Sequence, residues 1–254
     1  MTAAVLIAAF VAVLFLLPPA VLAVFAALLV AAAGHEWGRL CRLAGARAWI
    51  YGVLIAVAFA ALYVAGEPAL RAAFLVAAIF WLAAAPVWLW RGVQAPQRIA
   101  LLIGGFLVLV PAGLALASLQ PSAVLAVLVL VWVADTAAYF VGRSLGRHKL
   151  APSISPGKTW EGAVGGVLGA LAYAIICTGF VERIAWLPLV AGAAALAALS
   201  IVGDLFESAA KRQAGVKDSG ALLPGHGGIL DRIDSATAVL PLAALLLSWV
   251  RANG

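Results

Sequence analysis

The sequence predicts an all-α, polytopic integral membrane protein. Of its 254 residues, 66% are hydrophobic and only 10% are charged, and the mean hydropathy is +1.15. Soluble domains usually carry about 25% charged residues. The apolar residues also fall into separate long runs, as membrane-spanning helices require. A water-facing fold of this length could not bury so much apolar surface.

Nine apolar runs follow one another and predict about nine transmembrane helices. A span needs roughly 20 apolar residues, so the first two runs and the last are short candidates. Proline breaks the longest stretch at positions 18 and 19, because it lacks an amide donor. A cleaved signal peptide is the alternative for the first run, although no basic segment precedes it. The runs are Ala3–Leu17, Pro19–Gly34, Ala48–Ala65, Ala69–Trp90, Ile99–Leu119, Ser122–Gly142, Gly162–Phe180, Ile184–Val202 and Ser235–Val250.

The basic residues predict the orientation of these helices. Thirteen of the 16 lysines and arginines lie in or beside the loops after runs two, four, six and eight. The positive-inside rule therefore places these loops and the N-terminus in the cytoplasm and the C-terminus outside. The net charge of +6 is mostly a topological signal that also suits a surface near anionic membrane lipids. It gives no reason to expect nucleic acid as a partner.

The polar residues divide the chain into two parts. Residues 1–120 are expected to form a scaffold of lipid-facing membrane helices with contacts for a dimer, and residues 121–254 to form the catalytic membrane region with its cytoplasmic loops. In the first part His35 and Glu36 stand out, and an interfacial role is favoured for them over a catalytic one. The two cysteines are far apart and lack metal-site spacing, so they are interpreted as structural thiols.

Three features of the second part precede its densest polar region. Asp135 lies inside an apolar run, where an unpaired carboxylate is costly. It should face a partner or a polar cavity, and a structural role and a site role both stay open. Residues 155–159 precede a helix whose N-terminal amides, with Lys158 beside them, suit an anionic group. Gly165 and Gly169 give that helix a face for close packing.

The densest polar region begins at the end of the eighth run. Asp204, Glu207, Ser208 and Lys211 have the spacing of residues that share one face of a helix, if that helix continues past the run. A loop rich in charge and glycine follows. The last run then opens with two acids, Asp231 and Asp234, and the two helices can bring these acids together.

Carboxylates flanked by lysine and arginine are typical of phosphoryl chemistry. Their oxygens hold Mg²⁺, which bridges phosphate oxygens, and the cations neutralise the remaining charge. Glycine lets backbone amides approach a phosphate closely. For His226, shaping the loop or contacting phosphate is favoured over acting as a base, because a phosphate nucleophile is already ionised.

The same region resembles the phosphatidate cytidylyltransferases, also called CDP-diacylglycerol synthases. Spacing and residue type agree over the whole of their signature, and the likeness covers about residues 132–240. The matching stretches are Ser208–Arg212, Lys217–Gly220 and Leu223–Asp234, together with Asp135, Ser155–Glu161 and Gly203–Ser208.

This resemblance implies that CTP and phosphatidate react to give CDP-diacylglycerol and pyrophosphate. It assigns Asp204 and Asp231 as catalytic acids that hold Mg²⁺, with K⁺ as a second ion, and Lys211 as the catalytic cation at the reacting phosphates. It also implies a homodimer in the bacterial cytoplasmic (inner) membrane, with the active site facing the cytoplasm. From their chemistry, the substrate-binding candidates are Lys158, Ser208, Arg212, Lys217, Asp218, His226, Gly227, Gly228, Arg232 and Asp234.

Two other functions remain open at this stage. One is a cytidylyltransferase or kinase for another lipid phosphate, because any lipid tail would meet ordinary apolar helices. The other is a transporter for an anionic solute, although the polar groups cluster on one side and the two halves are dissimilar, unlike those of many transporters.

Overall fold

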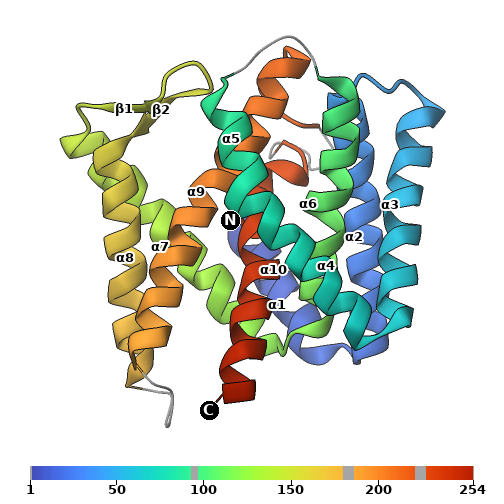
Figure 1. Ribbon diagram of the computed structural model, residues 1–254, viewed down its shortest axis with the longest axis horizontal. Helices are drawn as coiled ribbons and strands as arrows, with labels where there is room; N and C mark the ends of the chain where they lie inside the picture. Colours follow the sequence, from blue (N-terminus) through green and yellow to red (C-terminus); the bar gives the residue numbers. More distant parts are fainter. Residues whose placement is uncertain (1, 93–96, 180–185, 221–226, 254) are drawn as a thin grey trace.

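The computed structural model describes residues 2–92, 97–179, 186–220 and 227–253 and confirms the all-α fold class. Most of these residues belong to helices that run up and down through one bundle (Figure 1). In chain order the elements are α1 (Thr2–Leu16), α2 (Pro19–Leu40), α3 (Ala46–Ala65), α4 (Glu67–Ile79), η1 (Phe80–Ala84), α5 (Ala85–Trp90), α6 (Arg98–Ser118), α7 (Pro121–Leu145), β1 (Lys149–Ala151), β2 (Ser155–Thr159), α8 (Trp160–Thr178), α9 (Trp186–Ala214) and α10 (Leu230–Asn253).

The helices confirm a multi-pass membrane protein. Within the described residues, eight helices are long and apolar enough to cross a membrane. One of them, Glu67–Trp90, consists of α4 and α5 joined by the π-helical turn η1. α1 is shorter, with 15 residues, whereas a span tolerates about 17. The first of the nine predicted spans is therefore too short to be counted among the membrane-spanning helices.

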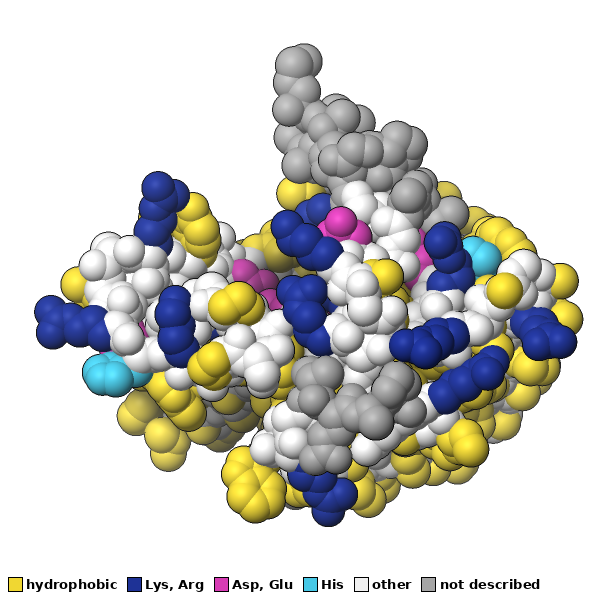
Figure 2. All heavy atoms as spheres, turned by 90° about the horizontal axis from the view of Figure 1, so that it is seen from above, with side chains coloured by type: hydrophobic (Ala, Val, Ile, Leu, Met, Phe, Trp, Pro, Cys, Tyr) yellow, Lys and Arg dark blue, Asp and Glu magenta, His cyan; other side chains and the backbone are white. Residues whose placement is uncertain are grey.

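The basic segments meet at one end of the bundle. The C-terminal ends of α2, α5, α7 and α9 all lie at the top of Figure 1, and the C-terminus lies at the bottom. Figure 2 looks onto this end, which we call the basic end, and shows lysine and arginine side chains spread across it with acidic side chains between them. The charge pattern predicted this common end. Its assignment to the cytoplasm stays a prediction.

A small β-hairpin projects at the basic end, where the sequence indicated only a polar segment. Its strands β1 and β2 are antiparallel, with Lys149 opposite Thr159. Strands of three and five residues are too short for a recognisable alternation of apolar and polar side chains. α8 follows at once, and the Thr159 hydroxyl accepts a hydrogen bond from the Gly162 amide at 3.1 Å. Thr159 therefore occupies one of the amides that were predicted to bind an anion.

α7 and α8 pack closely along the predicted glycine face. A Cβ atom on Gly165 would lie 2.6 Å from Val141, and one on Gly169 would lie 2.7 Å from Ala137. These distances are shorter than any ordinary carbon contact, so the predicted close packing is confirmed. The covering helix belongs to the same chain. This face is therefore filled within the monomer and does not support the predicted dimer.

We expect Gly165→Ala to destabilise the protein by about 1–3 kcal/mol, because the new methyl group overlaps the stiff, β-branched Val141. Gly192→Ala in α9 is the matched control: its Cβ would lie 3.7 Å from Leu246, and alanine favours a helix over glycine. The melting temperature in detergent measures both. A Gly165 variant as stable as the Gly192 variant would contradict this packing.

An aromatic cluster fixes α9 against the N-terminal half. The ring of Phe206 lies 4.9 to 6.1 Å, between centroids, from those of Trp37, Phe80, Trp81 and Trp88. Phe80 and Trp81 come from η1, and single π-helical turns are frequent near functional sites. Because α9 carries polar residues on another face, this packing sets where those residues point.

Candidate active site

α9 continues past its apolar run and carries a polar face. The Ser208 hydroxyl donates to Asp204 Oδ1 at 3.3 Å, and Lys211 Nζ lies 3.1 Å from Glu207 Oε1. These contacts confirm that the four residues share one face of the helix. Glu207 is only 3% exposed, so its pair with Lys211 is buried in the protein.

The start of α10 supplies the next acids. The helix begins at Leu230, ahead of the apolar run, so Asp231 lies on its first turn and Asp234 follows three residues later. Asp231 Oδ1 accepts a hydrogen bond from Lys211 Nζ at 2.7 Å. Lys211 therefore stands between acids of two helices, and Asp231 and Lys211 are each 12% exposed.

The hairpin and α7 complete the group. Lys158 of β2 forms an ion pair with Asp204, and both side chains are about one quarter exposed. Asp135 of α7 and Asp234 of α10 lie within electrostatic range of Asp204 and of Lys158. Asp135 therefore lies near charged side chains of other segments, and it is exposed.

These residues form what we call the acid–lysine cluster. Four segments of the chain, α7, β2, α9 and α10, contribute to it. Its members are Asp135, Asp204, Glu207, Asp231, Asp234, Lys158 and Lys211. Carboxylates outnumber lysines in this set, and an excess of hard oxygen ligands beside fixed cations suits a divalent cation that carries phosphate groups.

Sequence reasoning missed Glu36, which lies behind the cluster. Its side chain is completely buried, and Oε2 accepts hydrogen bonds from the Leu230 amide at 2.9 Å and the Ser219 hydroxyl at 3.2 Å. The predicted interfacial role is therefore wrong for Glu36. His35 is half-buried and stacks on the exposed ring of Trp49, with 3.9 Å between the ring centroids, and its interfacial role stays a prediction.

Close packing explains why glycine occupies positions 220, 227 and 228 near Asp231 and Glu36. The Gly228 amide donates to Asp231 Oδ2 at 2.9 Å. A Cβ atom on Gly228 would lie 2.1 Å from the Ser219 hydroxyl, and one on Gly220 would lie 2.4 Å from Glu36 Oε1. Gly227 has a φ of +80°, a conformation that favours glycine. Glycine at these positions lets the backbone close over buried carboxylates.

Comparison with known proteins identifies the family. A family model described as "Cytidylyltransferase family" matches residues 1–250. This protein belongs to the cytidylyltransferase family. A phosphatidate cytidylyltransferase of Pseudomonas aeruginosa is 41% identical over 94% of this chain and 92% of its own.

Two other relatives match the cytidylyltransferase over a shorter length. A phosphatidate cytidylyltransferase of Haemophilus influenzae is 46% identical over 49% of this chain and 45% of its own length. One of Staphylococcus saprophyticus is 53% identical over 46% of this chain and 45% of its own length. Their identity is higher over a shorter match, which indicates that the strongest likeness lies in about half of the chain.

Among the predicted site residues of the cytidylyltransferase, Arg212 makes its described hydrogen bonds outside the cluster. Arg212 donates to the backbone oxygens of Ile154 and Val216, both at 3.2 Å, and so ties α9 to the hairpin tip. Arg212 is exposed, and so are the side chains of Lys217, Asp218 and Arg232. His226 lies outside the described residues. The predicted phosphate contacts of all these residues stay predictions.

The carboxylates of the cytidylyltransferase fit a magnesium ion. Within the described part of the chain, no three His, Cys, Asp or Glu side chains lie close enough to hold a metal by themselves. Mg²⁺ is usually bound by one or two carboxylates together with water and substrate phosphates, so two acids are sufficient. The ammonium groups of Lys158 and Lys211 contact Asp204 and Asp231, so each carboxylate already lies against a positive charge, as it would beside a metal ion.

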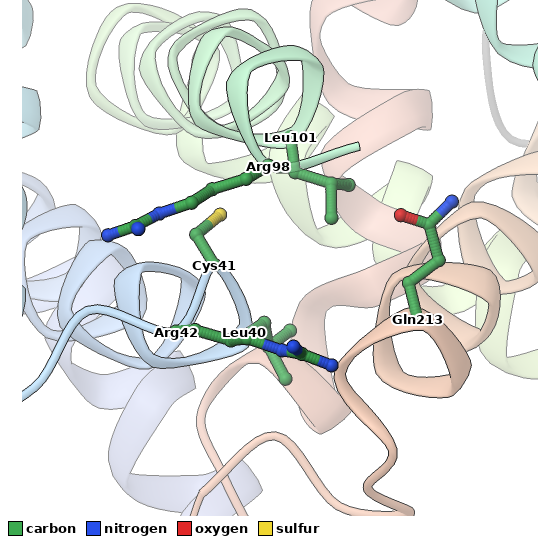
Figure 3. Close-up of a pocket in the computed structure, with 6 residues that line it drawn as sticks. All are labelled: Leu40, Cys41, Arg42, Arg98, Leu101 and Gln213. Atoms are coloured by element: carbon green, nitrogen blue, oxygen red, sulfur yellow. The ribbon is translucent and has the colours of Figure 1, made fainter. Parts of the chain in front are cut away.

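A small cavity lies beside the end of α2, at the start of α6 and the end of α9 (Figure 3). Its volume is about 10 Å³, which is about the space of one water molecule, so it does not hold a nucleotide. Burial raises the pKa of the Cys41 thiol to about 12, and Cys41 is therefore an unreactive, structural thiol as predicted. The residues that line this cavity are Leu40, Cys41, Arg42, Arg98, Leu101 and Gln213.

Proposed function

We propose that this cytidylyltransferase transfers a cytidylyl group from CTP to phosphatidate, giving CDP-diacylglycerol and pyrophosphate. The observation that carries the proposal is the acid–lysine cluster itself: carboxylates and lysines from four segments meet at the basic end of a membrane bundle. A lipid phosphate lies at that depth, and a soluble nucleotide can reach it from water. The likeness to phosphatidate cytidylyltransferases over nearly the whole chain supports the same activity.

The reaction needs positioning and charge neutralisation more than proton transfer. A phosphate oxygen of phosphatidate forms a bond to the α-phosphorus of CTP. The bond from that phosphorus to the bridging oxygen of the β-phosphate breaks, and pyrophosphate leaves with the electron pair. Lys158 and Lys211 lie beside the proposed metal ligands Asp204 and Asp231, and fixed positive charges there would stabilise the developing negative charge on the phosphates.

Asp204 and Asp231 are the proposed magnesium ligands, with K⁺ as a second ion beside them. The metal would supply neutralisation of the phosphate oxygens. The residues of the chain then have separate tasks. Glu207 holds Lys211 at 3.1 Å, Ser208 donates to Asp204, and the Gly228 amide orients Asp231.

The protein is proposed to lie in the inner membrane of a bacterium, with its active site facing the cytoplasm. The relatives come from bacteria, and the basic residues gather at the end that carries the cluster. Membrane lipids are the other partners. A homodimer is part of the proposal, and since α7 covers the glycine face of α8, its contacts would involve other surfaces.

We expect Lys158→Met to lower kcat/KM for CTP by about 100-fold, because the change removes a cation that faces a phosphate. Lys149→Met is the matched control, since Lys149 is exposed on the other strand of the same hairpin. Initial rates of pyrophosphate release measure both variants. Equal rates for the two variants would remove Lys158 from the substrate site.

Pyrophosphate release by the purified protein in detergent tests the function. With CTP, phosphatidate and Mg²⁺ we expect release that stops when any of the three is left out. Release of a nucleoside diphosphate in place of pyrophosphate, from CTP or ATP, tests the lipid-kinase alternative, and replacing phosphatidate by an isoprenoid phosphate tests a different acceptor. A folded protein that releases neither pyrophosphate nor nucleoside diphosphate with any lipid phosphate would contradict the proposal and favour the transporter.

A further inference from the structure

Glu36 is a buried carboxylate with an unusual environment. Its side chain is 0% exposed, and Oε1 has no hydrogen-bond partner within the described residues. Burying a carboxylate is costly unless donors or cations compensate it. The described donors to Glu36 both come from the far end of the chain, from Ser219 and Leu230. The contact therefore joins the N-terminal half to the acid–lysine cluster.

The first contact of Glu36 fixes the start of α10. Leu230 is the first residue of that helix, and its amide donates to Glu36 Oε2 at 2.9 Å. The first amides of a helix have no partner inside it, and the positive end of the helix dipole favours a nearby negative charge. Glu36 therefore caps α10 from another helix, one residue before Asp231.

The second contact reaches Asp231 through Ser219. The Ser219 hydroxyl lies 3.2 Å from Glu36 Oε2 and 2.9 Å from Asp231 Oδ2. A hydroxyl has one hydrogen to donate, so it serves one carboxylate at a time. The Ser219 and Gly228 amides donate to Asp231 as well, at 3.0 and 2.9 Å. Asp231 is thus held by several donors. One of them, the Ser219 hydroxyl, can donate to Glu36 instead.

The backbone around Asp231 is built closely over the Glu36 carboxylate. A Cβ atom on Gly220 would lie 2.4 Å from Glu36 Oε1, and one on Gly228 would lie 2.6 Å from Oε2. The backbone at Gly220 and the backbone at Gly228 therefore pack on the same carboxylate. A substitution of Glu36 would therefore disturb the backbone at Gly220 and at Gly228.

We infer that Glu36 is a positioning residue of the active site, which orients Asp231 through Ser219 and the first turn of α10. With a cation at Asp231, the Ser219 hydroxyl would donate to Glu36 instead, so that one donor fewer would compete with that cation for Asp231 Oδ2. This inference rests on the proposed function in assigning a magnesium ion to Asp231. Glu36 itself touches neither substrate nor metal.

The test compares Glu36→Gln, Ser219→Ala and the double variant with wild type, using Glu67→Gln as the matched control. Glu67 is exposed at the start of α4, so its change removes the same charge far from Asp231. The first readout is the Mg²⁺ concentration that gives half of the rise in melting temperature, measured without substrates. The second is the Mg²⁺ dependence of pyrophosphate release.

We expect Glu36→Gln and Ser219→Ala each to raise the half-saturating Mg²⁺ concentration about 10- to 100-fold in both readouts, as changes to groups that orient metal ligands do. The double variant should need no more Mg²⁺ for half-saturation than the single variant with the larger effect, because both changes act through one contact. Glu67→Gln should match wild type, and KM for CTP at saturating Mg²⁺ should change less than the Mg²⁺ requirement.

Unchanged Mg²⁺ dependence in Ser219→Ala would overturn the inference, even if Glu36→Gln does not fold. So would additive effects in the double variant. The proposed function fails in a different way: wild-type protein would then bind Mg²⁺ in the melting experiment yet release no pyrophosphate. The two failures are therefore distinguishable.

Discussion

We expect Asp231→Asn to lower kcat by roughly 10²- to 10³-fold, the scale of removing one electrostatic group from an active site. Asp231 accepts hydrogen bonds from Lys211 Nζ and from the amides of Ser219 and Gly228. Asparagine has the same size but no charge, and its amide group would meet these donors with a donor of its own. Initial rates of pyrophosphate release at several Mg²⁺ concentrations measure the effect.

Glu67→Gln also serves as the control for this experiment, because it removes one carboxylate at an exposed position in α4. The melting temperature of Asp231→Asn reports whether the fold survives. A folded Asp231→Asn protein with at least half of the wild-type rate would exclude Asp231 as a metal ligand and as a catalytic residue.

Lys211→Met is expected to have the second large effect, on stability and activity together. It leaves Glu207 and Asp231 without the cation that now lies 3.1 and 2.7 Å away. Breaking a buried ion pair by removing one partner costs about 3–5 kcal/mol, so the melting temperature should fall clearly. Activity should fall by roughly 10²- to 10³-fold as well, because the cation at the phosphates is lost.

The double variant Glu207→Gln/Lys211→Met separates these two effects. Neutralising Glu207 relieves one of the two carboxylates that lose their cation, so stability should recover part of its loss, while Asp231 stays without its ammonium partner. Activity should not recover, because Lys211 is still absent. A double variant that regains both properties would show that Lys211 acts only in folding.

The sequence predicted the fold and the α9 face because both depend on local patterns. Apolar runs of sufficient length indicate spans whatever their packing, and each of the nine runs corresponds to a helical segment. The spacing of Asp204, Glu207 and Lys211 follows from helix geometry, and the contacts of Lys211 agree with it. Asp231 could be placed near this face because only one loop joins α9 to α10.

The rest of the site depends on contacts between distant segments. Glu36 lies 183 residues before Ser219, and in sequence it was one acid near the end of an apolar run, where an interfacial position is ordinary. Lys158 reaches Asp204 by way of a hairpin too short to recognise. Arg212 was a candidate phosphate contact from its chemistry, and in the structure its guanidinium donates to backbone oxygens of Ile154 and Val216.

The fate of the two ends of CTP tests the central claim most directly. Purified protein is incubated with phosphatidate, Mg²⁺ and CTP labelled at either the α- or the γ-phosphate, and the lipid is extracted. The account predicts that the α label enters the lipid and the γ label is released as pyrophosphate, with neither event in Asp231→Asn. A γ label in the lipid would identify a kinase instead, and would contradict cytidylyl transfer at this site.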